Sequence, residues 1–317
     1  MLQYSKQISG GPCLISVSSI KDRLRNQSKK DGTTFQDKLL TYGLERTLYR
    51  ISTSPYNSKF TLKGGSFLYY AFGGKYARTT VDMDLLAQNT KNDEEEIGGI
   101  FKRIFEMQSD DGLFYDIKTL KVRRITEFKE YHGVKVTINA YLDKTLIPIS
   151  IDIGFGDVIY PDRKEIVFPV LLNNEIPHIY AYSIYSTIAE KYEAIVSLGL
   201  ANSRYKDFYD IYILARNFNI NGEDLKIAIK KTFENRKTGF NDIAAFNDEF
   251  INDEINIKRW DSFVKKKRAI IKISLKETIN LLKIFLLPVN ESIINETSFN
   301  YYWNSKVTKW QNSEISE

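Results

Sequence analysis

The sequence predicts an α/β (α+β) fold, in which a sheet with flanking helices is followed by a helical C-terminal domain. Three observations support this prediction. Segments rich in β-branched residues are concentrated between residues 114 and 153, and such residues favour strands. From Ser183 onward the apolar residues recur at helical spacing. A chain of 317 residues is also long enough to form two domains.

The N-terminal half is expected to alternate between helices and strands. Helical spacing of apolar residues predicts a helix over 35–49, and acidic residues at 93–96 suit the positive start of another helix. A short apolar run over 60–62 ends in glycines, which fits a buried strand that leads into a helix over 66–72. Further strands are expected over 81–86, 114–119, 122–128, 134–141 and 147–153.

The character of the sequence changes after Pro161, which sets the expected domain boundaries. We expect a first domain with N-terminal helices over 1–165 and a helical domain over 166–290. Residues 291–317 are polar, and a polar terminus is commonly loose. We therefore expect a flexible tail there.

Composition excludes several classes of protein. Cys13 is the single cysteine, so no internal disulfide can form, which fits a reducing cytoplasm. His132 and His178 stand far apart, so a zinc site of clustered histidines and cysteines is not expected. Neither a signal pattern nor an apolar run of membrane-spanning length is apparent. We expect a cytoplasmic protein with no membrane partner.

The positive charge is unevenly distributed. The chain carries a net charge of +5, whereas the segment 258–283 alone contains nine Lys and Arg against Asp261 and Glu277, an excess of seven. Such a stripe is typical of a surface that meets a phosphate-rich partner. A solvated helix face is an equally good interpretation of this segment.

Three aspartates are the first candidates for chemistry. Asp82 and Asp84 are two residues apart in an expected strand, so their carboxylates project from the same face. Asp152 interrupts the apolar run Ile147 to Ile153, where an unpaired carboxylate would be costly to bury, which favours a functional or ion-paired role. Carboxylates that converge in this way suit magnesium bound to substrate phosphates, with manganese as the alternative ion. An exposed strand with a chance D-x-D is the competing interpretation.

A glycine turn precedes the acids. Gly64 and Gly65 allow close approach of the backbone to an anion, and Ser66 then begins a helix whose free N–H groups attract phosphate. Lys63 and Arg78 flank this region, where they could hold phosphate or simply balance the acids. The turn and the acids together predict a nucleotide-binding site.

A lysine on an apolar helix face provides a further candidate. Lys191 shares its face with Ile188 and Ile195, and Asp207 lies on the apolar face of the next expected helix. A buried charge requires an opposite charge or a ligand. Either a Lys191–Asp207 bridge joins the two helices, or Lys191 reaches nucleotide phosphates while Asp207 orients it.

These motifs together resemble a known family. The sequences LKGGS, R-x-T-x-D-x-D and IDIGFGD are similar to those of the nucleotidyltransferase superfamily, and within it to the AbiEii/AbiGii-type toxins of toxin–antitoxin and phage-defence modules. A downstream A-E-K helix followed by R-x-K-D-x-x-D also resembles this family, and its last acid is Asp210. The gap between Ser66 and Asp82 is longer than in the compact superfamily pattern.

The resemblance implies a fold, an activity and site residues. It implies a mixed-sheet nucleotidyltransferase core, with a helical domain that contributes Lys191 and Asp207 to the cleft. The catalytic residues would be Asp82, Asp84, Asp152, Lys191 and Asp207, of which the first three would bind the metal. The nucleotide-binding residues would be Lys63, Gly64, Gly65, Ser66, Arg78, Lys191 and Asp210.

The implied reaction transfers a nucleoside monophosphate from a magnesium–NTP to RNA, with the 3′ end of tRNA as the favoured acceptor. Such a toxin would block translation, and a cognate antitoxin protein would relieve the inhibition. Two alternatives remain open. One is NTP-dependent modification of a protein hydroxyl, and the other is a nucleotide-binding module that acts on a partner without catalysis.

Overall fold

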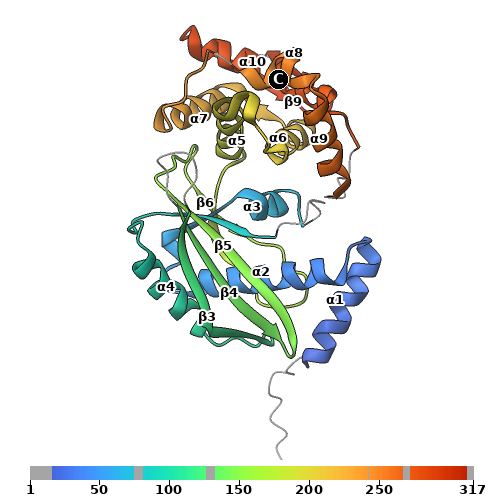
Figure 1. Cartoon of the computed structure of the whole chain (residues 1–317). Coiled ribbons are helices and arrows are strands. Elements are labelled where there is room, and N and C mark those ends of the chain that lie inside the picture. Colours follow the sequence, from blue (N-terminus) through green and yellow to red (C-terminus); the bar gives the residue numbers. More distant parts are fainter. Residues whose placement is uncertain (1–15, 75–80, 126–132, 242, 267–271, 313–317) are drawn as a thin grey trace, which may run out of the picture.

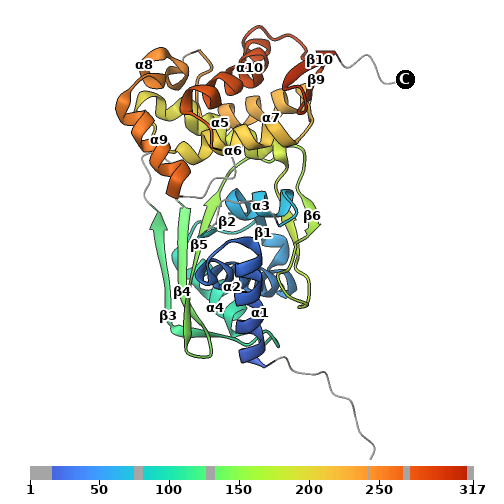
Figure 2. The same ribbon diagram turned by 90° about the vertical axis from the view of Figure 1, so that its right-hand side faces the viewer.

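The computed structural model describes residues 16–74, 81–125, 133–241, 243–266 and 272–312. The predicted fold class is confirmed, since a mixed sheet with flanking helices is followed by a helical region (Figure 1). We refer to residues 16–181 as the sheet lobe and to residues 184–312 as the helical lobe. Figures 1 and 2 show the helical lobe stacked on one end of the sheet lobe, with α3 (Gly64–Ala71) between them.

The sheet lobe contains a seven-stranded sheet in the order β3-β4-β5-β2-β1-β7-β6. Its strands are β1 (Phe60–Lys63), β2 (Met83–Ala87), β3 (Leu113–Ile125), β4 (Gly133–Leu142), β5 (Thr145–Phe155), β6 (Lys164–Val167) and β7 (His178–Ala181). The β1–β2, β3–β4, β4–β5 and β6–β7 pairs are antiparallel, whereas β2–β5 and β1–β7 are parallel. The sheet therefore continues past the expected boundary at residue 165.

Strand positions differ from the predictions in two places. The strands expected over 114–119 and 122–128 form one strand, β3, with a register irregularity between Asp116 and Lys121; residues 126–128 lie outside the described ranges. The strand expected from residue 81 begins at Met83, so Asp82 immediately precedes it. Of the two acids, Asp84 therefore lies in the strand and Asp82 lies just before it.

The long strands β3, β4 and β5 have one covered face and one open face. In β4, Val134, Val136 and Ile138 are buried, whereas Lys135 and Thr137 between them are partly exposed. This alternation is the period of two that a half-buried strand requires. Helices α2 (Phe35–Thr53) and α4 (Glu94–Glu106) pack on the buried side, behind the strands in Figure 1.

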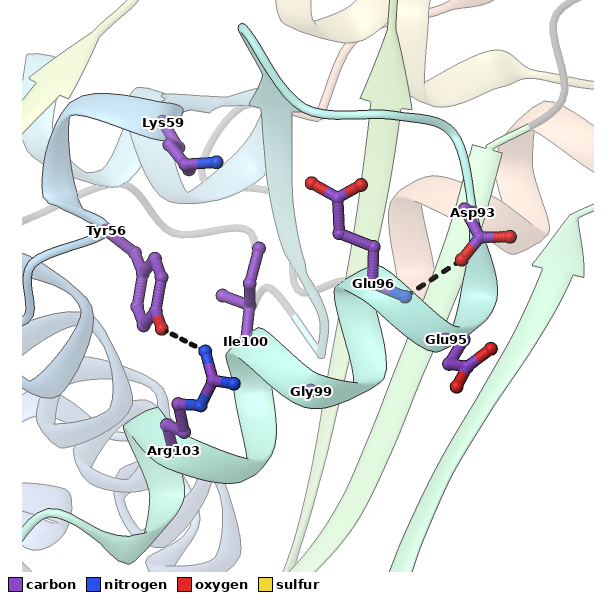
Figure 3. A pocket seen from close by; sticks show the side chains of 8 residues that line it. All are labelled: Tyr56, Lys59, Asp93, Glu95, Glu96, Gly99, Ile100 and Arg103. Atoms are coloured by element: carbon purple, nitrogen blue, oxygen red, sulfur yellow. Dashed lines mark hydrogen bonds between the residues drawn. The ribbon is translucent and has the colours of Figure 1, made fainter.

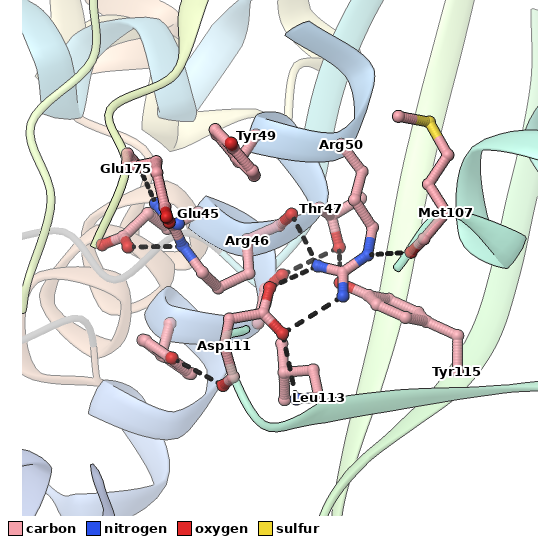
Figure 4. Close-up of polar contacts among 12 residues, drawn as sticks. Glu45, Arg46, Thr47, Tyr49, Arg50, Met107, Asp111, Leu113, Tyr115 and Glu175 are labelled. Carbon is pink, nitrogen blue, oxygen red and sulfur yellow. Dashed lines mark hydrogen bonds and ion pairs between the residues drawn. The ribbon is translucent and has the colours of Figure 1, made fainter. Parts of the chain in front are cut away.

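Helix α2 contains buried charged residues that its sequence pattern does not predict. A capping box between Thr34 and Asp37 starts the helix, as is typical of a helix N-terminus. Further along, the Arg50 guanidinium binds the carboxylate of buried Asp111, and Arg46 Nε donates to Glu45 Oε1 at 2.9 Å (Figure 4). The Arg50–Asp111 contact fastens α2 to the segment that enters β3, whereas the Arg46–Glu45 pair lies within α2.

Helices dominate the second lobe, as expected. They are α5 (Ile184–Leu198), α6 (Tyr205–Asn217), α7 (Gly222–Asn235), α8 (Asp248–Ile251), α9 (Glu254–Lys266) and α10 (Leu275–Ile294). The side chain of Ser183 caps the start of α5 by accepting a hydrogen bond from the Ser186 N–H. In the sheet lobe, α1 (Val17–Asp31) lies N-terminal to α2.

The flexible tail expected from residue 291 is wrong for residues 291–312. Helix α10 runs to Ile294, and a hairpin of β9 (Tyr301–Asn304) and β10 (Lys309–Asn312) pairs with β8 (Ile220–Asn221). Trp303 is fully buried, and its indole N–H donates to the Ala215 carbonyl at 2.6 Å. Burial of this indole explains why a polar segment is ordered here.

Candidate active site

A row of charged side chains crosses the sheet where the two lobes meet. In the strand register, Lys63 is paired with Asp84, Asp84 with Asp152, and Asp152 with Lys135. Directly paired residues project from the same face of a sheet. Four neighbouring strands, from two separate stretches of the chain, thus bring two of the predicted acids side by side, between two lysines.

Gly64 and Gly65 lie against the Asp84 carboxylate. Gly64 has φ of +61°, and a Cβ at this position would be 2.0 Å from Asp84 Oδ2. The Gly65 N–H donates weakly to the same oxygen at 3.4 Å. The sequence predicted close approach of an anion to this turn, and the anion found there is a carboxylate of the protein itself. Ser66 follows in α3 and is 6% exposed.

Burial and charges of both signs act on the Asp84 carboxylate. Desolvation raises the pKa of Asp84 first, and the neighbouring charges of Asp82 and Asp152 raise it further, while Lys206 and Lys63 lower it. A carboxylate in such surroundings is stabilised by any cation that enters. The site therefore favours a positively charged ligand or metal ion beside Asp84.

Asp82 and Asp84 fit a metal ion better than the full set of three acids does. Asp152 Oδ1 lies 2.5 Å from Lys135 Nζ in an ion pair. Across the described ranges, no three His, Cys, Asp or Glu side chains are grouped closely enough to hold a metal ion. Magnesium commonly takes one or two carboxylates and completes its shell with phosphate oxygens and water. The donor set of Asp82 and Asp84 fits that pattern.

Lys63 takes part in an ion network between the lobes. Its Nζ lies 2.6 Å from Asp157 Oδ2 and 3.0 Å from Glu190 Oε2, and Arg236 binds Asp157 at 2.7 Å. These cations hold the pKa of Asp157 well below its usual range despite its burial. Lys63 thus joins β1 to α5, and its observed partners are carboxylates.

Lys191 lies in a second buried cluster. Its Nζ is 2.9 Å from Asp207 Oδ1 and 2.7 Å from Asp210 Oδ2, and Arg204 Nε binds Asp207 at 2.7 Å. Lys191 and Arg204 hold the pKa of Asp207 well below its usual range. The bridge that the sequence suggested is present, and it includes Asp210 as a second acid. A role of Lys191 in binding nucleotide remains a prediction.

Two lysines near the acids were not predicted as site residues. Lys135 alternates with buried valines in β4, so its position opposite Asp152 follows from strand periodicity once the register is known. Lys206 is exposed at the start of α6, next to Asp207, and its charge acts on Asp84. The R-x-K-D-x-x-D motif contains Lys206 and was the available signal for it. Arg78 lies outside the described residues.

A pocket of about 580 Å³ lies elsewhere in the sheet lobe, beside α4 (Figure 3). Its lining includes Lys59 and Arg103 on one side and Glu95 and Glu96 on the other. Lys59 precedes the start of β1, at the opposite end of that strand from Lys63. None of the predicted site residues lines this pocket, so it is separate from the candidate active site.

The comparisons with known proteins place these features in a family. The family model described as "Nucleotidyl transferase AbiEii toxin, Type IV TA system" matches residues 46–272, which include the glycine turn, the acids and the Lys191 cluster. The chain belongs to this AbiEii nucleotidyltransferase toxin family. No curated protein sequence matches the chain.

Two solved structures from Helicobacter pylori are similar to this chain. JHP933 is 16% identical, with a TM-score of 0.46, covering 82% of this chain and 94% of its own. A protein provisionally assigned as a nucleotidyltransferase is also 16% identical, with a TM-score of 0.45, covering 81% of this chain and 96% of its own. Separately, no helix within the described ranges combines the length and apolar character that crossing a membrane requires.

Proposed function

We propose that this toxin transfers a nucleoside monophosphate from an NTP to the 3′ end of an RNA, with tRNA as the favoured acceptor, and thereby blocks translation. The observation that carries this proposal is the pairing of Asp84 with Asp152 beside the Gly64–Gly65 turn. Membership of a type IV toxin–antitoxin family supports a cognate antitoxin protein as a further partner.

In this proposal Asp82 and Asp84 hold magnesium, which when bound would neutralise phosphate charge and align the triphosphate. The Gly65 and Ser66 N–H groups at the start of α3 face the β- and γ-phosphates. Lys206, exposed on α6 and close enough to act on Asp84, supplies a positive charge for the triphosphate. Lys191 is proposed to contribute either directly or by fixing α6 through Asp207 and Asp210.

The transfer itself needs an attacking oxygen and a leaving group. The RNA 3′ oxygen forms a bond to the α-phosphorus, the bond between that phosphorus and the α–β bridging oxygen breaks, and pyrophosphate leaves. The proton of the attacking hydroxyl passes to the Asp152 carboxylate, which Lys135 orients through their 2.5 Å ion pair. Asp152 thus acts as base while the other two acids hold the metal.

Labelled nucleotides test this function directly. Purified protein is incubated with total RNA and each α-labelled or γ-labelled NTP in turn, and the products are separated by size. We expect α-label, and not γ-label, on a tRNA-sized band. Asp82→Asn and Asp84→Asn should each reduce labelling by at least 100-fold, because each removes a proposed metal ligand. Asp93→Asn, at the N-cap of α4, is the matched control, because an asparagine side chain can still accept the capping hydrogen bond from the Glu96 N–H.

Other outcomes identify other functions. A γ-labelled product would indicate phosphotransfer, and α-label on protein instead of RNA would indicate modification of a protein hydroxyl. If the Asp82→Asn/Asp84→Asn double variant stops growth of cells as effectively as the unaltered chain, the catalytic proposal is wrong and a binding role is favoured.

A further inference from the structure

The open face of β3, β4 and β5 continues the charged row of the active site. Beyond Lys135, the register pairs Arg123 of β3 on the same face, and the next row contains Lys121, Thr137 and Ser150. Lys121 and Arg123 are exposed, and Lys135 is 40% exposed. Within the described ranges, neither Lys121 nor Arg123 forms an ion pair with an acid. Basic side chains therefore extend outward from Asp152 along this face.

The other end of the same face presents apolar and aromatic groups to solvent. There the register aligns Phe114, Tyr141 and Leu146 in one row. Phe114 is 65% exposed and Leu146 is 45% exposed. Six residues of extended β4 separate Lys135 from Tyr141, which corresponds to about 20 Å. Neighbouring exposed apolar groups of this kind are more informative than single ones, because contiguous exposed apolar patches commonly mark binding sites.

The position of this face in the molecule leaves it accessible. The helices α2 and α4 pack on the opposite side of these strands (Figures 1 and 2). In Figure 2, α9 of the helical lobe lies on the same side of the molecule as the open face. Lys258 and Lys265 of the basic segment are exposed on α9. The helix that carries part of the basic segment is thus on the same side as the open face.

We propose that the open face of β3–β5 binds the single-stranded 3′ segment of the acceptor RNA. The backbone phosphates lie on Lys121, Arg123 and Lys135, and unpaired bases stack on Phe114 and Tyr141. This inference rests on the proposed function, since it assigns the surface that delivers the acceptor to that site. Basic grooves with exposed aromatic rings are the features by which proteins bind single-stranded nucleic acid.

The order of the side chains gives the RNA a direction. The basic row ends at Asp152, the proposed base, whereas the aromatic row is about 20 Å away. The terminal nucleotide therefore lies at the basic end with its 3′ hydroxyl at Asp152, and preceding nucleotides run towards Phe114. A fully base-paired end would hide its base faces from the aromatic rings, so the face selects acceptors with an unpaired 3′ segment.

The test compares two charge reversals of equal size. Lys121→Glu/Arg123→Glu alters the open face, and Lys306→Glu/Lys309→Glu alters two exposed lysines of the β9–β10 region in the helical lobe. The readouts are α-label transfer to RNA, affinity for a fluorescent single-stranded RNA, and calorimetric affinity for magnesium–NTP. We expect the open-face variant to lose at least tenfold in labelling and in RNA affinity, with NTP affinity within twofold of the unaltered chain.

Salt dependence separates charge from stacking. Loss of two phosphate contacts should reduce the slope of log affinity against log salt by about 1.4, since each contact to a single strand contributes roughly 0.7. Phe114→Ala should lower RNA affinity about tenfold but leave this slope unchanged, because stacking releases no counterions. Phe114 is exposed, so its truncation leaves the core intact.

Three outcomes distinguish the inference from the function on which it rests. Loss of labelling in the open-face variant alone supports the inference. Equal labelling and RNA affinity in the two charge-reversal variants would overturn it and leave the proposed function standing. If the unaltered chain transfers no label to any RNA, the proposed function fails and the inference falls with it.

Discussion

The Asp84 carboxylate packs directly against Gly64, in the space that a side chain at position 64 would fill. A Cβ on Gly64 would be 2.0 Å from Asp84 Oδ2 and 2.8 Å from Asp84 Cβ, and its φ of +61° is one that glycine adopts most readily. The glycine turn is therefore needed to accommodate the carboxylate. Any larger residue at position 64 must displace Asp84 from its place beside Asp152.

Substitution of Gly64 should consequently disable the site more than it unfolds the protein. We expect Gly64→Ala to reduce label transfer by at least 100-fold and to destabilise the fold by about 1–3 kcal/mol through backbone strain. Gly73→Ala is the matched control, because Gly73 has φ of +62° with nothing within 4 Å of an added Cβ. Similar activity in the two variants would show that the Gly64–Asp84 contact is dispensable.

Lys191 can be tested for a role beyond its ion cluster. Lys191→Met leaves Asp207 and Asp210 with fewer partners, so we expect about 3–5 kcal/mol of destabilisation in chemical unfolding. Adding Asp210→Asn removes the acid that Arg204 does not bind, and should restore part of that stability. If Lys191 binds nucleotide, affinity for magnesium–NTP stays low in the double variant. Recovery of NTP affinity together with stability would assign Lys191 a purely structural role.

Glu45 should make stability depend on pH. Burial raises the pKa of Glu45 to about 7, although Arg46 and the Leu171 N–H oppose the shift. Because the folded state holds the proton more tightly, the contribution is present below pH 4.5 and is lost as pH rises to about 7. Relative to Glu45→Gln, the free energy of unfolding should fall by on the order of 2–3 kcal/mol over that range.

Parallel unfolding curves in denaturant at several pH values provide the measurement for Glu45. Exposed Glu106 on α4 supplies the control variant, Glu106→Gln, which should follow the unaltered chain. If Glu45→Gln and the unaltered chain change equally with pH, the pKa of Glu45 is the same in the folded and unfolded states and the assignment is incorrect.

The C-terminal hairpin should be part of the cooperative fold. Trp303 packs against Phe285 and Trp310, with ring centroids 4.7 and 5.4 Å away. We expect Trp303→Ala to lower the free energy of unfolding by about 3–5 kcal/mol. Tyr301→Ala, at a ring that is 40% exposed on the same strand, should have a clearly smaller effect. If Trp303→Ala lowers the free energy of unfolding by less than about 1 kcal/mol, the hairpin is docked without contributing to stability.

The local elements of the fold could be predicted because their signals are local. Residues 35–49 show helical spacing, and they lie within α2; Ser183 precedes a helical pattern, and it caps α5. Turn residues and periodicity depend on neighbours a few positions away. By contrast, β6 and β7 were missed because strands of four residues carry little pattern of their own.

The fold class, the glycine turn and the identity of the acids could be predicted from the residues alone, since these depend on residue type and short spacing. The pairing of Asp84 with Asp152, the ion pair of Lys135 with Asp152, and the binding of Lys63 to carboxylates of other elements became apparent from the folded chain. Strand register and the packing of the two lobes bring together residues between 17 and 94 positions apart, and spacing along the chain does not encode those neighbours.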